Sequence, residues 1–322
     1  MTLQAIAAPV SVAPSGDGGV QAWARFRRNR PAVVAAVVLV ALILVAVFAP
    51  MIATHDPNQQ FLAAPTGGVL DPMAPRETGK FLAPTAEHLF GTDHLARDIF
   101  SRTVVGLRVS LAAAAFAIVV AGLIGITVGV LAASGPRWLD SFLMRVTDIG
   151  YAFPDLLLII MLRAALGDSL FGAREMFGLE ASILLLFAAI GLTAWPTMAR
   201  LVRGQLLAVR ETEFSLAAVS LGASPARIAL RHWLPHTAGP VIVEATFLAP
   251  RAIFAEAALS FIGLGVTAPG ASLGGLINDH FEFVMLRWTA LAFPVGVLAL
   301  LFLCSQYLGD GLRDALDPRA RR

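Results

Sequence analysis

Lysine is almost absent from this chain of 322 residues, because Lys80 is the only one. A Walker A loop, which binds the phosphates of a nucleotide, needs a Gly-Lys pair followed by Ser or Thr. Here Gly79 and Lys80 are followed by Phe81, and Ala74 stands where the first glycine of the loop would be. The chain therefore has no P-loop, and any ATP chemistry must be carried out by a partner.

Cysteine and charge are also scarce. Cys304 is the only cysteine, so no disulfide can form within the chain, and its apolar surroundings favour a buried packing residue over a reactive thiol. Charged residues make up 14% of the chain and hydrophobic residues 57%. A soluble domain carries about 25% charged residues. This composition excludes water as the main solvent and predicts an integral membrane protein.

Long apolar runs, by contrast, are abundant. A helix needs roughly 20 apolar residues to cross about 30 Å of hydrocarbon. Six stretches have this length: residues 32–52, 109–132, 143–165, 182–200, 241–262 and 288–308. They predict an all-α integral membrane protein with six transmembrane helices. A cleaved signal peptide is the alternative for the first stretch, but no small-x-small cleavage site follows it, so we favour an uncleaved anchor.

The distribution of arginine gives the expected orientation. With the N-terminus inside, the cytoplasmic loops hold about twice as many Arg and Lys residues as the outer loops, which is the usual bias of membrane proteins. Both termini are therefore predicted to be cytoplasmic. The expected division is a cytoplasmic N-terminal segment 1–31, a first transmembrane helix 32–52, a periplasmic loop 53–107, a five-helix core 108–308 that includes a cytoplasmic loop 201–240, and a cytoplasmic tail 309–322.

The second half of the periplasmic loop predicts a surface helix. Asp93 is the expected N-cap, and Asp98 and Arg102 are spaced for an i,i+4 ion pair. An apolar stripe follows the helical period: Leu95, Ile99, Val104 and Leu107. We expect this helix to lie on the outer leaflet and to run into the second transmembrane helix.

The cytoplasmic loop between the fourth and fifth stretches predicts two short helices. The first ends at Gly222, which suits the left-handed backbone position just after a helix. The second has Ser224 as N-cap and Pro225 at its first position, and it is expected to end at Leu234-Pro235. The loop is therefore a helix–turn–helix bracket that projects from the membrane.

One face of the first bracket helix is apolar. Its residues have the i, i+3, i+4, i+7 spacing of a helix face: Phe214, Ala217, Ala218 and Leu221. The two alanines let another surface approach the helix backbone, with Phe214 as an anchor. The pattern leaves two interpretations open, a docking face for a partner and a hairpin folded back onto the chain's own cytoplasmic surface.

This loop resembles a known motif. Residues 216–218 (Leu-Ala-Ala), three residues, Gly222, nine residues and residues 232–235 (His-Trp-Leu-Pro) are similar to the EAA loop of ABC importer permeases. That motif reads Glu-Ala-Ala, three residues, Gly, nine residues, Ile-x-Leu-Pro. Leu216 replaces the glutamate and His232 the isoleucine. The resemblance implies contact with an ATPase through shape and apolar surface more than through a salt bridge.

Three further segments are similar to the C-type permeases of dipeptide, oligopeptide and nickel importers: residues 90–111, 257–265 and 308–319. With the bracket they form four ordered blocks across about 85–319. The chain departs from the family pattern at Ala96, where a glycine is usual, and at Leu273, where a tryptophan is usual.

The resemblance implies the type I ABC importer permease fold in the bacterial cytoplasmic (inner) membrane. It implies four kinds of partner: a homologous B-type permease subunit, two cytoplasmic ABC ATPase subunits, a periplasmic or lipid-anchored substrate-binding protein, and the lipid bilayer. No catalytic residue, bound cofactor or nucleic-acid partner is expected, because ATP and Mg would bind to the ATPase subunits. Di- or oligopeptides are the expected cargo, and nickel chelates or another small solute are the alternative. The implied coupling residues are Phe214, Ala217, Ala218, Leu221, Gly222, Leu234 and Pro235.

Ionisable residues inside predicted transmembrane helices mark transport paths or internal ion pairs, because charge is costly in hydrocarbon. Asp148 and Glu256 are interpreted as lining the translocation path or its gate, and structural ion pairing is the alternative. Glu244 and Arg251 share one face of the fifth stretch, but seven residues separate them. We expect this pair to be too distant for direct contact.

A glycine stripe and the spacing of the histidines do not indicate a functional site. Gly122, Gly125 and Gly129 form a small-residue stripe, which is typical of close helix packing. The histidines have no metal-ligand spacing to a nearby acid or cysteine, so no metal site is expected.

An ion-coupled secondary transporter and a membrane-embedded enzyme are the alternative classes. The first is disfavoured because the chain shows no inverted internal repeat. The second is disfavoured because no clustered His, Asp, Glu or Ser constellation is evident at either membrane face.

Overall fold

The computed structural model describes residues 18–61, 79–170, 175–176, 179–266 and 270–316, and nearly all of this part is helical. The helices are α1 (Gly18–Arg28), α2 (Arg30–Val47), α3 (Ala49–Ile52), α4 (Ile99–Ser134), α5 (Arg137–Ala152), α6 (Asp155–Leu170), α7 (Ala181–Arg210), α8 (Glu213–Ser220), α9 (Pro225–Ile228), the π-helical turn η1 (Ala229–Trp233), α10 (Leu234–Phe261), α11 (Leu273–Phe281) and α12 (Trp288–Leu316). Two short strands, β1 (Glu175–Met176) and β2 (Leu179–Glu180), pair antiparallel. The predicted all-α class is confirmed.

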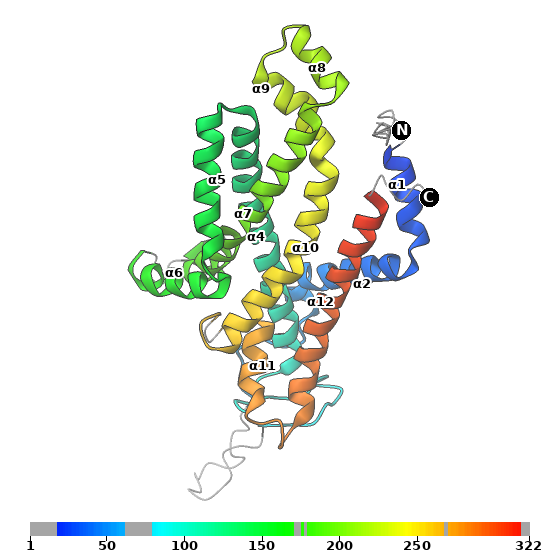
Figure 1. The fold of residues 1–322 in the computed structure, drawn as a ribbon. Coiled ribbons are helices and arrows are strands. Elements are labelled where there is room, and N and C mark those ends of the chain that lie inside the picture. Colours follow the sequence, from blue (N-terminus) through cyan, green and yellow to red (C-terminus); the bar gives the residue numbers. More distant parts are fainter. Residues whose placement is uncertain (1–17, 62–78, 171–174, 177–178, 267–269, 317–322) are drawn as a thin grey trace, which may run out of the picture.

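Four of the described helices are long and apolar enough to cross a membrane: α2, α4, α7 and α12. All but the last residue of the stretch 241–262 lies inside α10, and this part of the helix carries three charged residues, Glu244, Arg251 and Glu256. The stretch 143–165 is not one helix, because α5 and α6 are separated at Phe153 and Pro154. A residue before proline disfavours the helical backbone. Figure 1 shows that α6 turns away from the direction of α5 at this break.

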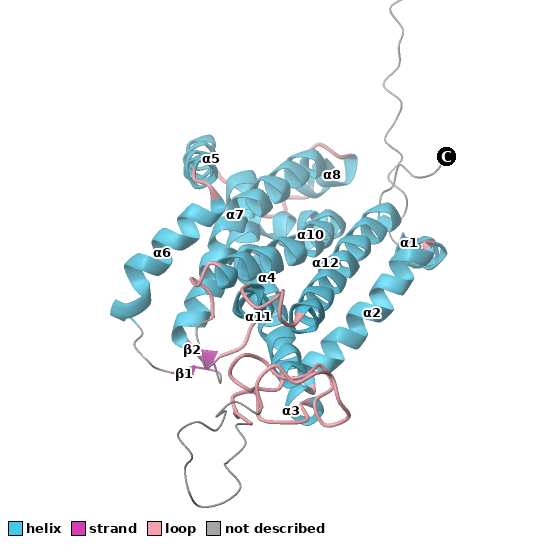
Figure 2. Cartoon of the chain, turned by 90° about the horizontal axis from the view of Figure 1, so that it is seen from below, coloured by secondary structure: helices cyan, strands magenta, loops and turns pink. Residues whose placement is uncertain are grey.

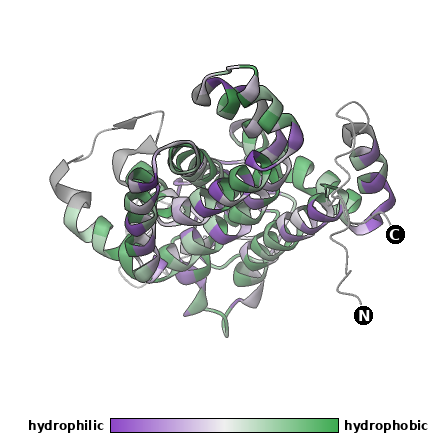
Figure 3. Cartoon of the chain, turned by 45° about the horizontal axis from the view of Figure 1, so that its top comes forward, coloured by the Kyte–Doolittle hydropathy of each residue, from purple (hydrophilic) through white to green (hydrophobic). Residues whose placement is uncertain are grey.

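The outward faces of these helices are apolar. On α2, large aliphatic side chains between 41% and 64% exposed follow one another along the helix: Val34, Val37, Val40, Ile43, Leu44 and Val47. Figure 3 shows hydrophobic residues, in green, along most of the packed helices. A continuous apolar surface of this size requires a covering apolar phase. The structure therefore supports the predicted multi-pass membrane protein.

The helices are arranged around α4 and α7, which lie side by side. Helix α10 packs against both, and α2 packs against α12 and α4. Figure 2 shows α2 beside α12, and Figure 1 shows that the two helices cross. The α8–α9 hairpin, the start of α1 and the end of α12 lie toward one end of the bundle, and α11 and residues 79–98 lie toward the other (Figure 1). The ends of the described chain and the hairpin are therefore on the same side.

The contact between α4 and α7 depends on glycine. A Cβ atom at Gly125 would lie 2.5 Å from the Met198 Cβ, and one at Gly129 would lie 2.8 Å from the Ala199 carbonyl oxygen. A Cβ at Gly122 would meet nothing within 4 Å. Two of the three predicted glycines thus bring the helices together, and Gly122 does not.

The segment before α4 differs from the prediction. Asp98, and not Asp93, is the N-cap of α4, because its carboxylate accepts a hydrogen bond from the Ser101 backbone N–H at 2.8 Å. Asp93 instead receives the Arg97 guanidinium at 2.7 Å. The expected ion pair between Asp98 and Arg102 is wrong. Arg102 instead points toward Asp279, and 3.7 Å separate Arg102 Nη2 from Asp279 Oδ2.

The expected helix runs into the second apolar stretch as predicted, but its expected position on the surface is wrong. Residues 99–107 are the first turns of α4, and Ile99, Val104 and Leu107 are buried. Helix α11 covers them, since a Cβ at Gly106 would lie 3.0 Å from the Leu273 backbone nitrogen. On α11, burial lowers the pKa of His280, whose Nδ1 donates to the Leu276 carbonyl oxygen at 2.6 Å.

We predict opposite effects for one methyl group at two positions of α4. Gly129→Ala should lower the free energy of unfolding by about 1–3 kcal/mol, because the added Cβ overlaps the backbone of α7. Gly122→Ala is the matched control and should raise it by up to about 1 kcal/mol through helix propensity. Thermal unfolding of the purified full-length chain in detergent tests both, and equal shifts would contradict the proposed contact.

Candidate functional site

The hairpin at the end of the bundle is shorter than the predicted loop 201–240. Helix α7 continues to Arg210 and α10 begins at Leu234, so only the residues between them form the hairpin. Both helices extend beyond their predicted apolar stretches and carry the hairpin outward (Figure 1). The bracket is thus mounted on two long helices, which makes its position depend on theirs.

Gly222 ends the first helix as predicted. Its φ is +78°, a left-handed conformation that side chains with a Cβ rarely adopt. The Ala223 N–H bonds to the Ala218 carbonyl at 3.2 Å, and the Gly222 N–H bonds to the Val219 carbonyl at 2.9 Å. These two bonds define a Schellman motif, which satisfies carbonyl groups at the end of α8.

The second helix starts as predicted but does not end as predicted. The Ser224 hydroxyl accepts from the Arg227 backbone N–H at 3.4 Å, and Pro225 follows at the first helical position. The helix does not close at Leu234-Pro235, because η1 connects α9 directly to α10. Pro235 has no N–H for the usual helical bond. The Leu234 N–H bonds to the Ala229 carbonyl, and this wider π turn maintains the helical path.

Two side-chain contacts hold α8 against this continuous helix. The Trp233 indole N–H donates to the Ser215 hydroxyl at 2.8 Å, and both residues are buried. The Phe214 ring stacks on the His236 ring with a centroid distance of 4.8 Å. A displacement of α8 therefore acts on the first turns of α10 through a buried hydrogen bond and a ring contact.

The predicted docking face is divided by the fold. Phe214 and Ala218 are half-buried against the chain itself, whereas Ala217 is exposed and Leu221 is 88% exposed. Leu216 and Val219 also project outward, at 57% and 55% exposure, although helical spacing did not place them on the predicted face. One indication in the sequence that Leu216 belongs to the outward surface is that it is apolar at the position where the motif has a glutamate. The outward surface of α8 consists of Leu216, Ala217, Val219 and Leu221.

A second feature is a pair of cavities beside α10. One, of about 300 Å³, lies among α5, α6, α7 and α10, and the other, of about 690 Å³, lies among α7, α10 and α12. Glu244 and Arg251 line both, with their Oε1 and Nη1 atoms 3.6 Å apart. The prediction that this pair is too distant for contact is wrong. Helical side chains lean toward the N-terminus, so the long Arg251 side chain reaches back toward Glu244.

The two predicted path residues have other surroundings. Asp148 is 65% exposed and receives the Arg200 guanidinium at 2.6 Å, while Arg200 lies over the Tyr151 ring. Glu256 is fully buried. Its carboxylate accepts from the Ser110 hydroxyl at 2.6 Å and from the Ser260 hydroxyl at 2.8 Å. Glu256 thus joins α4 to α10.

These features define a class: a multi-pass membrane protein with a helical bracket on one side and polar cavities between its helices. Solved structures share the fold. In inward-facing crystal forms of the MetNI methionine ABC transporter, one chain aligns with a TM-score of 0.54 at 19% identity, over 68% of this chain and 98% of that chain.

Comparison with known protein families identifies the family to which this chain belongs. Residues 125–322 match the family described as binding-protein-dependent transport system inner membrane component, and residues 19–72 match the N-terminal transmembrane domain of oligopeptide transport permease C. This chain belongs to the family of binding-protein-dependent transport permeases. The predicted type I ABC importer permease fold is thereby confirmed.

Relatives match over nearly the whole chain. The dipeptide transport system permease protein DppC of Bacillus subtilis (strain 168) is 37% identical over 96% of this chain and 88% of its own length. The oligopeptide permease OppC of the same organism is 37% identical over 94% of this chain and 90% of its own length. The glutathione transport system permease protein GsiD of Escherichia coli O6:K15:H31 is 36% identical over 93% of this chain and 90% of its own length.

The serine cluster around Glu256 gives a test of its structural role. Glu256→Leu should lower the free energy of unfolding, because each buried hydroxyl left without its acceptor costs about 1–3 kcal/mol. Glu256→Gln keeps one acceptor oxygen and should cost less. Glu244→Leu is the control, since a partly exposed ion pair contributes about 0–1 kcal/mol. Thermal unfolding of the three variants in detergent measures the order, and an unchanged Glu256→Leu protein would refute this role.

Proposed function

We propose that this chain is the C-type permease subunit of an ATP-binding-cassette importer that carries short peptides into the bacterial cytoplasm. The single observation that supports this cargo most is the agreement among relatives matched over nearly the full chain. Their names specify dipeptides, oligopeptides and glutathione, which is itself a tripeptide. Nickel chelates or another small solute remain the second candidate cargo, and only the family resemblance supports them.

The proposed complex contains a related B-type permease, two ATPase subunits and a substrate-binding protein on the outer side. ATP and Mg²⁺ bind to the ATPase subunits, because this chain has no P-loop lysine. The excess of arginine in the loops on the hairpin side supports a cytoplasmic position for the hairpin and both termini. This chain then supplies the transmembrane path and the mechanical coupling.

We propose that an ATPase subunit binds to the outward surface of α8. Large apolar side chains that are exposed beyond the apolar belt need a covering partner. Leu216 stands where the motif has a glutamate, so the contact depends on shape and apolar surface. Phe214 and Ala218 lie behind this surface and transmit its movement to α10. The conformation of the bracket depends on three other residues, Gly222, Leu234 and Pro235.

The proposed translocation path follows the α10 face that carries Glu244 and Arg251. A zwitterionic peptide presents one positive and one negative end, and this pair offers both complementary charges along two cavities. Asp148 lies at the edge of this path through its contact with Arg200, which covers the cavity residue Tyr151. Glu256 acts by holding the helices and does not contact cargo.

Reconstitution tests the transport function. The complete complex in proteoliposomes should take up a labelled dipeptide only with ATP, and vanadate should stop this uptake. Uptake by the purified chain alone, driven by a proton or sodium gradient, would contradict the proposal and support an ion-coupled carrier.

The cargo has a separate test. The binding protein of the same complex should melt at a higher temperature with dipeptide, oligopeptide or glutathione than without ligand. A shift with nickel chelates and none with any peptide would replace the peptide assignment but leave the permease assignment intact.

Gly222 gives a test of coupling. Gly222→Val should strongly reduce ATP-dependent uptake, because a β-branched residue strains the left-handed backbone at the end of α8. Gly222→Asn is the control and should retain most uptake, since asparagine tolerates this conformation. Membrane insertion should be equal in both, as measured by the amount of chain recovered in the membrane fraction. Full uptake by Gly222→Val would refute the coupling role of the bracket.

A further inference from the structure

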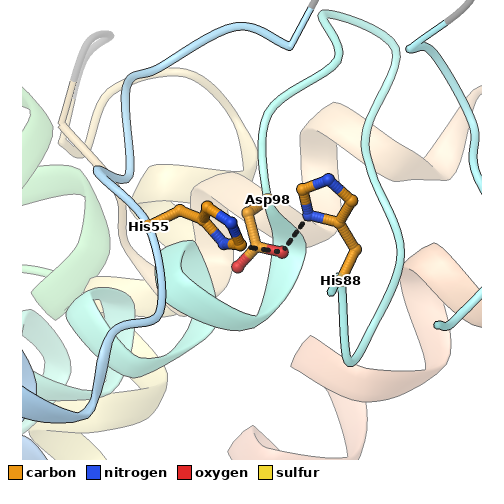
Figure 4. Close-up of side chains that lie close together, drawn as sticks. All are labelled: His55, His88 and Asp98. Atoms are coloured by element: carbon orange, nitrogen blue, oxygen red, sulfur yellow. Dashed lines mark hydrogen bonds and ion pairs between the residues drawn. The ribbon is translucent and has the colours of Figure 1, made fainter. Parts of the chain in front are cut away.

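The outer end of the bundle contains a cluster that chain spacing did not predict. His55 follows α3, His88 lies in the loop before α4, and Asp98 is the N-cap of α4. One ligand atom from each residue lies within 4.8 Å of the others. Figure 4 shows the two imidazole rings on either side of the carboxylate. Three segments that are distant in sequence therefore bring two nitrogens and one oxygen together.

The distances suit a metal ion. His88 Nδ1 is 2.9 Å from Asp98 Oδ1, and His55 Nδ1 is 3.9 Å from the same oxygen. Four ligands placed tetrahedrally at zinc bond lengths lie about 3.3 Å from one another. The two separations lie on either side of this value, and all three ligand atoms lie within 4.8 Å of one another.

The charge balance also favours a cation. Asp98 is fully buried, and among the described residues its ion-pair partners are the two imidazoles, which carry charge only when protonated. The nearby carboxylates of Asp93 and Asp279 are paired with arginine. A buried carboxylate without a cation is costly. The N-terminal end of α4 offsets only part of its charge, and a divalent ion at this position would offset the rest.

The surrounding residues hold these ligands in place. Asp98 Oδ2 is occupied by the Ser101 N–H, which leaves Oδ1 for the histidines. The Ser101 hydroxyl accepts from the His55 backbone N–H at 3.1 Å. The Phe61 ring packs edge-on against both imidazoles at 4.8 Å. Such supporting contacts orient ligands in protein metal sites.

The cluster is accessible on one side. The His55 side chain is 19% exposed and that of His88 is 6% exposed. The exposed Thr54 hydroxyl lies 3.0 Å from His55 Nδ1 and marks the open side of the cluster. Two imidazoles and one carboxylate suit zinc and related transition metals, whereas magnesium and calcium prefer oxygen ligands alone.

We propose that His55, His88 and Asp98 bind a divalent transition-metal ion of the zinc class on the outer side of the membrane. The ion joins the segment after α3, the loop before α4 and the first turn of α4. It thereby ties the outer end of the first transmembrane helix to the start of the second. This site is independent of the transported cargo.

The experiment uses the full-length chain without an affinity tag, purified in detergent and stripped with EDTA. After incubation with zinc chloride and gel filtration, mass spectrometry of the eluted protein should find one zinc per chain. X-ray absorption should show two imidazole nitrogens at about 2.0–2.1 Å. Zinc should also raise the unfolding temperature, because the ion binds the folded chain.

Two variants and a control separate this site from adventitious binding. His55→Ala removes a partly exposed ligand and should weaken zinc affinity by at least about tenfold. Asp98→Asn keeps the N-cap acceptor but removes the charge, and it should weaken zinc affinity similarly. His94→Ala changes a histidine of the same loop outside the cluster and should bind zinc as the unmodified chain does.

Three results would overturn the proposal. Loss of all zinc from the unmodified chain on gel filtration would leave a hydrogen-bonded His–Asp cluster only. Equal zinc affinity in His55→Ala, Asp98→Asn and the unmodified chain would place the ion elsewhere. Binding of magnesium or calcium in preference to zinc would exclude the assigned metal class.

Discussion

The close contact between α4 and α7 is the constraint on which the rest of the structure depends. Lipid offers no hydrophobic force between helices, so association in a membrane relies on close packing. Gly125 and Gly129 remove the side chains that would separate the two backbones, and Met198 and Val202 fill the space. Because α7 leads to the α8–α9 hairpin and α4 begins at the opposite end of the bundle, this contact connects the two ends of the molecule.

Continuity of the helices explains how a short hairpin can move a long bundle. The chain passes from α9 through η1 into α10 without an irregular loop, although Pro235 interrupts the regular hydrogen bonding. The buried bond between Trp233 and Ser215 attaches α8 to this path. The cavities beside Glu244 and Arg251 lie further along α10. A rigid bracket at one end of α10 is thus mechanically joined to the polar cavities along its length.

Buried charge is balanced in three different ways. The carboxylate of Glu256 is surrounded by serine hydroxyls, and that of Asp93 is neutralised by Arg97. Asp98 is bonded to a helix N-terminus and to imidazole. Each solution joins elements that are distant in sequence, so these acids determine where helices and loops meet. The third also creates a set of metal ligands.

Local patterns in the sequence determined the helical class, the membrane location and the two ends of the hairpin turn. Apolar length, the left-handed preference of Gly222 and the capping by Ser224 act within a few residues, through backbone hydrogen bonds and solvent. Sequence alone therefore predicted them correctly. The tertiary structure decided which of Asp93 and Asp98 caps α4, which side of α8 faces outward, and that Glu244 reaches Arg251. It also brought His55, His88 and Asp98 together. These outcomes depend on packing between distant segments, and spacing along the chain carries no information about such contacts.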